Sequence, residues 1–140
     1  MSADPTATGR CLCGAVRFRI EGEPITARQC WCRDCQYLAA GGATNNLLLR
    51  TEQLTWEGEV RWFESAADSG NVLARGFCPA CGTPLFVQSQ ARRHLTGVRL
   101  GALDAPLMAP QTLIWTSSAP AWAQLDPDLP HVERQPPPAA

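Results

Sequence analysis

Apolar and polar residues alternate along much of the chain, and this alternation predicts short β-strands. In the stretch AVRFRIEG, the apolar residues Val16, Phe18 and Ile20 are separated by arginines, which is typical of a strand with one buried face. Further strand-like runs stand at residues 44–50, 60–65, 71–77, 84–89 and 94–103. Gly, Pro, Asn and Ser separate these runs. The recurrence predicts a mainly β fold, a sandwich or a barrel-like sheet.

Two segments depart from this pattern. Residues 33–40 have room for about two helical turns, which the following pair of glycines would end. From Asp104 onward the chain is rich in proline, which cannot donate a hydrogen bond to a central sheet ladder. We therefore expect this segment to wrap the surface as edge or irregular structure, with Trp115 and Trp122 packed on the sheet.

The composition excludes several classes of function. All twelve basic residues are arginine, so there is no lysine for Schiff-base chemistry or for a phosphate-binding loop. A net charge of −1 without a basic run indicates neither nucleic acid nor an anionic membrane as a partner. No apolar run approaches the roughly 20 residues of a membrane span, and the N-terminus lacks a signal-peptide pattern. We expect a cytoplasmic protein whose seven cysteines act as ligands or reactive thiols.

Two of the three cysteine clusters resemble zinc knuckles. They read CLCG and CPACG, and in both a glycine, Gly14 or Gly82, follows the second cysteine. A knuckle turns the chain tightly and favours a residue that tolerates positive φ. Together the two clusters provide the four sulfurs of a closed structural zinc site: Cys11, Cys13, Cys78 and Cys81. Disulfides or unligated thiols are the alternatives.

The third cluster is then left with three cysteines and no fourth sulfur. In CWCRDC, Cys30, Cys32 and Cys35 could cover one side of a zinc ion and leave the other side open, as in catalytic zinc sites. Zinc is soft enough to hold a substrate thiolate at the open position. His94 and His131 are the two histidines available as a fourth ligand. A second structural site with a distant ligand and a redox-sensing disulfide remain as alternatives.

The elements GRCLCGAVRF, CWCRDCQ and GFCPACGTPLF resemble the glutathione-dependent formaldehyde-activating enzyme family, also called the GFA or centromere-protein-V family. The resemblance runs from Gly9 to Leu103 and less distinctly to Pro130. It implies an Mss4-like fold of antiparallel sheets, stapled by a four-cysteine zinc site and followed by the Pro-rich wrap. It also implies two zinc ions, one structural and one catalytic, with the same division of cysteines. A single domain over residues 9–134 would then lie between a flexible N-terminus (1–8) and a disordered tail (135–140).

The activity that this resemblance implies is that of a carbon–sulfur lyase, which joins formaldehyde to glutathione and gives S-hydroxymethylglutathione. The thiol of glutathione would take the open position of the zinc held by the third cluster. Many relatives carry histidine where this chain has Trp31, so the substrate is less well defined than the metal sites. Trp31 and Arg33 are weak candidates for substrate contacts. A non-catalytic binding module and a thiol-based redox sensor are the alternative functions.

Overall fold

The computed structural model describes residues 6–137, which form two β-sheets and one short α-helix. The smaller sheet has the strand order β1-β2-β5, with β1 (Ala7–Arg10), β2 (Arg17–Ile20) and β5 (Leu54–Glu57). The larger sheet has seven strands in the order β10-β3-β4-β9-β8-β7-β6. Their bounds are β3 (Thr26–Cys30), β4 (Thr44–Arg50), β6 (Arg61–Ala66), β7 (Val72–Phe77), β8 (Pro84–Ser89), β9 (Leu95–Arg99) and β10 (Thr112–Ile114).

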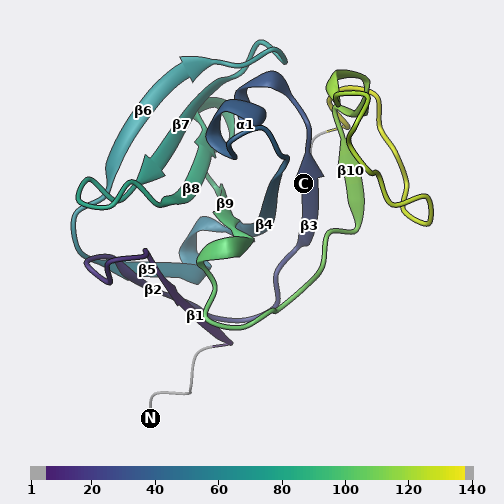
Figure 1. The fold of residues 1–140 in the computed structure, drawn as a ribbon. Coiled ribbons are helices and arrows are strands. Elements are labelled where there is room, and N and C mark those ends of the chain that lie inside the picture. Colours follow the sequence, from purple (N-terminus) through teal and green to yellow (C-terminus); the bar gives the residue numbers. More distant parts are fainter. Residues whose placement is uncertain (1–5, 138–140) are drawn as a thin grey trace.

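Neighbouring strands are antiparallel throughout both sheets, except that β10 runs parallel to β3. The helix α1 (Arg33–Leu38) follows β3 almost directly. In Figure 1 the larger sheet is strongly curved, the smaller sheet lies at its lower end, and β10 lies beside β3. No helix among residues 6–137 is long and apolar enough to cross a membrane.

The core lies between the two sheets and is mostly aliphatic, with Phe18 and Phe86 as its buried aromatic residues. Phe18 of β2 meets Phe86 of β8 edge to face, with ring centroids 5.5 Å apart. Trp56 of β5 lies 5.0 Å from the same Phe86 ring. The alternating apolar residues of the predicted AVRFRIEG strand, Val16, Phe18 and Ile20, are all buried. Their alternation with exposed arginines therefore buries one face of β2 against the larger sheet.

The prediction of a mainly β fold is confirmed, and the strands over residues 44–50 and 84–89 have the predicted bounds. The helix ends at Leu38, two residues earlier than predicted. Three strands were not predicted: β1, β3 and β5. The sequence of β3, TARQC, shows no regular alternation, because the buried Ala27 is followed by two polar residues, Arg28 and Gln29.

The C-terminal segment forms an edge, as predicted, because β10 is the last strand of the larger sheet. Trp115 is partly buried, but Trp122 is 69% exposed, so the prediction that both pack on the sheet is wrong for Trp122. Ala7 and Thr8 belong to β1, and Gln135 accepts a hydrogen bond from the Trp115 indole at 3.0 Å. Residues 1–5 and 138–140 lie outside the described part.

Candidate functional site

The two knuckle-like turns bring four sulfurs together. Cys11 and Cys13 follow β1, while Cys78 and Cys81 occupy the turn between β7 and β8. All four Sγ atoms lie within 4.8 Å of one another. The Sγ atom of Cys13 lies 3.6 Å from that of Cys11 and 3.8 Å from that of Cys78. Tetrahedral zinc with Zn–S bonds of about 2.3 Å separates its sulfurs by about 3.8 Å. The donor set and its spacing therefore fit a closed zinc site.

The local backbone explains why these turns form. Gly14 and Gly82 have φ values of 80° and 79°, so the expectation of positive φ after each knuckle is confirmed. Their N–H groups donate to the carbonyl oxygens of Cys11 and Cys78, at 3.1 and 2.8 Å. Hydrogen bonding to Thr83 lowers the pKa of the Cys81 thiol to about 5. A thiol of low pKa is ready to bind a metal as the thiolate.

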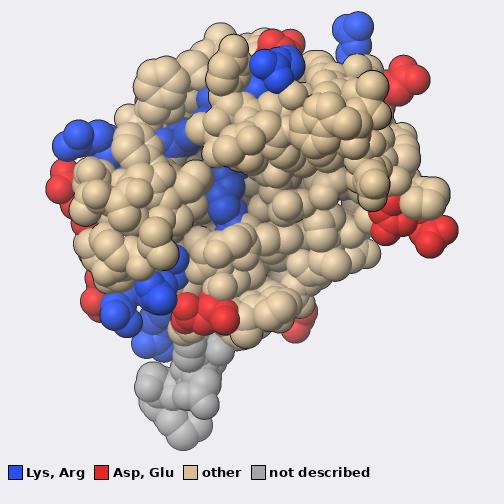
Figure 2. All heavy atoms as spheres, in the orientation of Figure 1, with Lys and Arg blue, Asp and Glu red and all other residues tan. Residues whose placement is uncertain are grey.

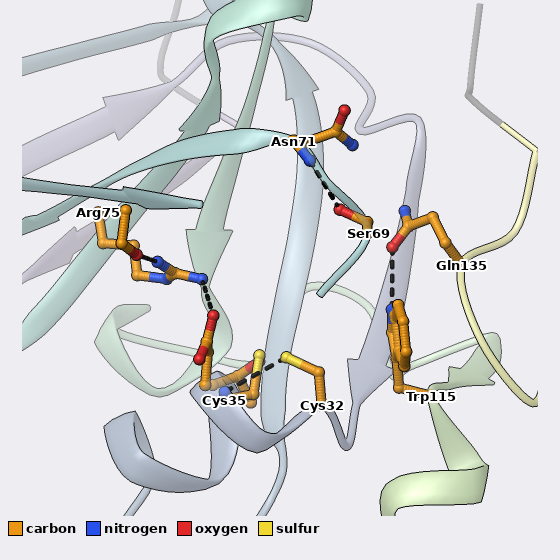
Figure 3. A network of polar contacts seen from close by, with 10 residues as sticks. Cys32, Cys35, Ser69, Asn71, Arg75, Trp115 and Gln135 are labelled. Carbon is orange, nitrogen blue, oxygen red and sulfur yellow. Dashed lines mark hydrogen bonds and ion pairs between the residues drawn. The ribbon is translucent and has the colours of Figure 1, made fainter. Parts of the chain in front are cut away.

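The third cluster lies where β3 passes into α1. Cys30 ends β3, Cys32 is the N-cap of α1, and Cys35 lies in its first turn. Their three Sγ atoms are within 4.8 Å of one another, and all three side chains are buried. The Sγ atom of Cys32 accepts a hydrogen bond from the backbone N–H of Cys35 at 3.3 Å (Figure 3). The cluster is therefore pre-formed by the strand–helix junction.

No fourth ligand of the usual kinds joins this cluster within the described residues. The ring Nε2 of His131 lies 2.8 Å from the carbonyl oxygen of Asp126, and His94 belongs to neither cysteine cluster. The nearby carboxylate of Asp34 pairs instead with Arg75, at 3.3 Å. Three soft donors without a fourth fit a zinc ion that keeps one position open.

The three thiols of this cluster differ in acidity. Hydrogen bonds from Cys30 and Cys32 lower the pKa of Cys35 to about 3, and the hydroxyl of Thr44 and the charge of Arg99 act in the same direction. Hydrogen bonds with the other two thiols raise the pKa of Cys30, and burial adds to this increase. The lowered pKa of Cys35 favours its thiolate, which is the form that binds soft metals.

A chain of side-chain hydrogen bonds connects the three-cysteine cluster to residues of β4 and β9. The hydroxyl of Thr44 donates to Cys35 Sγ at 3.0 Å, and Asn46 Nδ2 donates to the Thr44 hydroxyl oxygen at 3.0 Å. Arg99 Nη1 in turn donates to Asn46 Oδ1. Two side chains of β4 thus connect Cys35 to the buried guanidinium of Arg99 on β9.

The cluster opens into a cavity of about 260 Å³, close to the lower end of the range usual for small-molecule sites. The floor of the cavity is one face of the larger sheet, formed by alternate residues of β3, β4, β9, β8 and β7. Trp115 and Gln135 of the C-terminal segment and residues 67–69 of the β6–β7 loop also line it. Figure 3 shows Trp115 and Arg75 on opposite sides of the Cys32–Cys35 pair. The C-terminal wrap therefore takes part in the site.

The cavity is basic although the whole chain is slightly acidic. Four arginines and one aspartate line it: Arg28, Arg75, Arg92, Arg99 and Asp68. Figure 2 shows basic side chains recessed within a hollow on this face of the molecule. Burial lowers the pKa of both Arg28 and Arg99. A recessed surface of this kind attracts anions.

The structure places Trp31 and Arg33 away from the cavity lining. The indole N–H of Trp31, a buried side chain, donates to Gln29 Oε1 at 3.0 Å. Arg33 donates to Gln36 Oε1, and its guanidinium lies 5.1 Å from the ring centroid of Tyr37. The arginines that do line the cavity were not singled out from the sequence. A sequence feature that could have indicated them is an arginine inside a strand-like run, as in HLTGVRL around Arg99.

The fold is mainly β and carries one four-sulfur and one three-sulfur cluster that could each hold a metal ion. The three-sulfur cluster faces a cavity. Residues 6–118 match the family described as "Glutathione-dependent formaldehyde-activating enzyme". The chain belongs to this family.

A relative agrees with this assignment in sequence, and a solved structure is similar in fold. A protein of Halomonas elongata named "Putative glutathione-dependent formaldehyde-activating enzyme" is 27% identical over 125 residues, which cover 84% of this chain and 80% of the relative. The crystal structure of a Rhodobacter sphaeroides protein has a TM-score of 0.57 at 21% identity. That match covers 71% of this chain and 90% of the other, and it shows similarity of fold.

Proposed function

We propose that this protein is a zinc-dependent carbon–sulfur lyase that joins formaldehyde to a small thiol such as glutathione, giving S-hydroxymethylglutathione. The observation that carries the proposal is the three-thiol cluster that opens into a basic cavity. The family assignment supports the choice of glutathione and formaldehyde as substrates.

In this scheme the residues have separate tasks. Cys30, Cys32 and Cys35 would hold a zinc ion, which would supply a Lewis acid that lowers the pKa of a bound thiol. The substrate sulfur forms a bond to the carbon of formaldehyde, and the electron pair of the C=O double bond moves to its oxygen. That oxygen takes up a proton equivalent to the one that the thiol released, so the product carries S–CH2–OH. The basic lining would stabilise the negative charge that develops on oxygen.

The four-sulfur cluster has a different task in this proposal. It would hold a structural zinc that ties the turn after β1 to the β7–β8 turn. A hydrogen bond also links these two turns: the Leu12 N–H donates to the Thr83 hydroxyl at 3.0 Å. The closed cluster thus fixes the smaller sheet on the larger one.

The direct test follows the adduct at equilibrium. The protein is purified anaerobically, its zinc is counted, and exchange between glutathione–formaldehyde adduct and free reactants is measured by NMR. We expect wild type to accelerate exchange and the Cys32→Ser variant to lose most of the acceleration. If wild type with both clusters loaded gives only the buffer rate, the lyase proposal is wrong and a non-catalytic binding module becomes the better explanation.

A further inference from the structure

Two buried polar atoms in the described part of the chain have no hydrogen-bond partner: Arg99 Nε and Ser89 Oγ. Both residues line the cavity next to the three-thiol cluster. Arg99 is only 8% exposed, so water screens its guanidinium poorly. A buried donor without a hydrogen-bond partner is energetically unfavourable. In native structures such a group commonly hydrogen-bonds to a ligand or to an ordered water.

Arg99 is one end of a row of polar residues across three strands. Arg28 of β3 is directly opposite Asn46 of β4, which is directly opposite Arg99 of β9. Residues that oppose each other in antiparallel strands have side chains on the same face of the sheet. All three line the cavity. The row therefore places two guanidinium groups on the cavity floor with an amide between them.

The charge of these two arginines is not neutralised by a carboxylate. Neither Arg28 nor Arg99 forms an ion pair with another residue between positions 6 and 137. Arg75, in the same cavity, is different, because it donates to Ser65 Oγ at 2.8 Å and to Asp34 at 3.3 Å. Arg99 makes one hydrogen bond among the described residues, through Nη1 to Asn46, and its buried Nε has no partner. A largely buried guanidinium without a carboxylate partner favours an anionic ligand.

We propose that Arg99, supported by Arg28, is a carboxylate subsite that selects thiols carrying a carboxylate group. The inference rests on the proposed function in one respect, that the thiol of the same ligand is directed to Cys30, Cys32 and Cys35. Guanidinium donates to carboxylate through paired N–H groups, and Asn46 orients Arg99 for this contact. Arg99 is thus a specificity residue for the substrate.

In the competing role, Arg99 does not bind substrate. It only stabilises the negative charge of the cysteine cluster, to which Asn46 and Thr44 connect it. The two roles make different predictions for ligands with and without a carboxylate. The test measures binding by calorimetry with the zinc-loaded protein, using S-methylglutathione and its dimethyl ester, which lacks both carboxylates and keeps the ammonium group. Because the blocked sulfur cannot add to formaldehyde, binding is tested independently of lyase activity.

We expect wild type to bind S-methylglutathione at least about tenfold more tightly than the ester, since charged hydrogen bonds are strong. Arg99→Gln should remove most of this preference while affinity for the ester stays the same. The control Arg19→Gln, an exposed arginine of the smaller sheet, should bind both ligands as wild type does.

Three outcomes would overturn the carboxylate subsite. In the first, Arg99→Gln keeps the wild-type preference for S-methylglutathione over the ester. In the second, Arg99→Gln loses the same amount of affinity for both ligands. In the third, wild type itself shows no preference. Circular dichroism establishes whether Arg99→Gln is folded. If it is not, the half-buried Arg28 provides the second variant, and Arg28→Gln must reduce the same preference for the proposal to hold. Failure of the NMR exchange test with an intact preference would reject the lyase reaction and leave the subsite standing.

Discussion

At the scale of single residues, the three-thiol cluster depends on a donor outside it. The Thr44 hydroxyl contacts Cys35 Sγ at 3.0 Å and is itself held by Asn46. Thr44 is buried, so water does not compete for this hydrogen bond. Groups that hydrogen-bond to metal ligands orient them and tune their charge. Thr44 should therefore matter for metal binding although it is not a ligand.

We predict that Thr44→Val weakens zinc binding at the three-thiol cluster by about tenfold or more, because valine keeps the shape and removes the donor. Competition with a chromophoric chelator measures the affinity of the more weakly held zinc. Thr55→Val, at an exposed position of β5, is the matched control and should change nothing. Equal zinc affinity in Thr44→Val and wild type would mean that the hydrogen bond to Cys35 has no role in metal binding.

At the scale of elements, β1 packs unusually close to the core. A Cβ atom at Gly9 would lie 2.1 Å from Phe18 Cζ and 2.4 Å from the carbonyl oxygen of Ala102. Gly9 also bridges to Leu103, which connects β1 to the segment after β9. This close approach lets β1 pack directly on the Phe18 ring, which itself contacts Phe86 of the larger sheet.

Gly9→Ala should therefore lower the free energy of unfolding by about 1–3 kcal/mol or more, because overpacking shifts Phe18 or the backbone at Ala102. Urea denaturation followed by tryptophan fluorescence measures the change. Gly101→Ala is the control, since a Cβ there meets no atom within 4 Å and its stability should stay near that of wild type. Comparable stability of both variants would show that β1 can move away from the core without loss.

The elements also show what local sequence could predict and what it could not. Alternation identified β2 because one of its faces packs on the core, and glycine after each knuckle indicated the turns that gather the four sulfurs. β3 was not predicted because two successive polar residues, Arg28 and Gln29, break the alternation after Ala27. The Arg28–Asn46–Arg99 row depends on strand order and register, which bring residues 53 apart in sequence, Asn46 and Arg99, into contact. Local patterns carry no information on such a register.

At the scale of the whole molecule, the two cysteine clusters have different relations to the fold. The four-sulfur cluster joins segments that are far apart in the chain, since Cys13 and Cys78 are 65 residues apart. The three-thiol cluster lies within one strand–helix junction, and β3 and α1 are also held by neighbouring strands. Metal at the first cluster would stabilise the contact between the sheets. Metal at the second would contribute little to it.

Removing one ligand from each cluster should therefore give opposite results. Cys81→Ser should lower the melting temperature strongly or prevent folding, because a closed zinc site contributes its binding free energy to folding. Cys32→Ser should keep the fold and reduce the zinc content from two ions per chain to one. Metal analysis together with circular dichroism melts measures both effects. Serine keeps the size of the side chain in each variant, so each serves as the control for the other. If Cys32→Ser unfolds the protein while Cys81→Ser does not, the structural role belongs to the cluster at the cavity, and the open zinc position has to be abandoned.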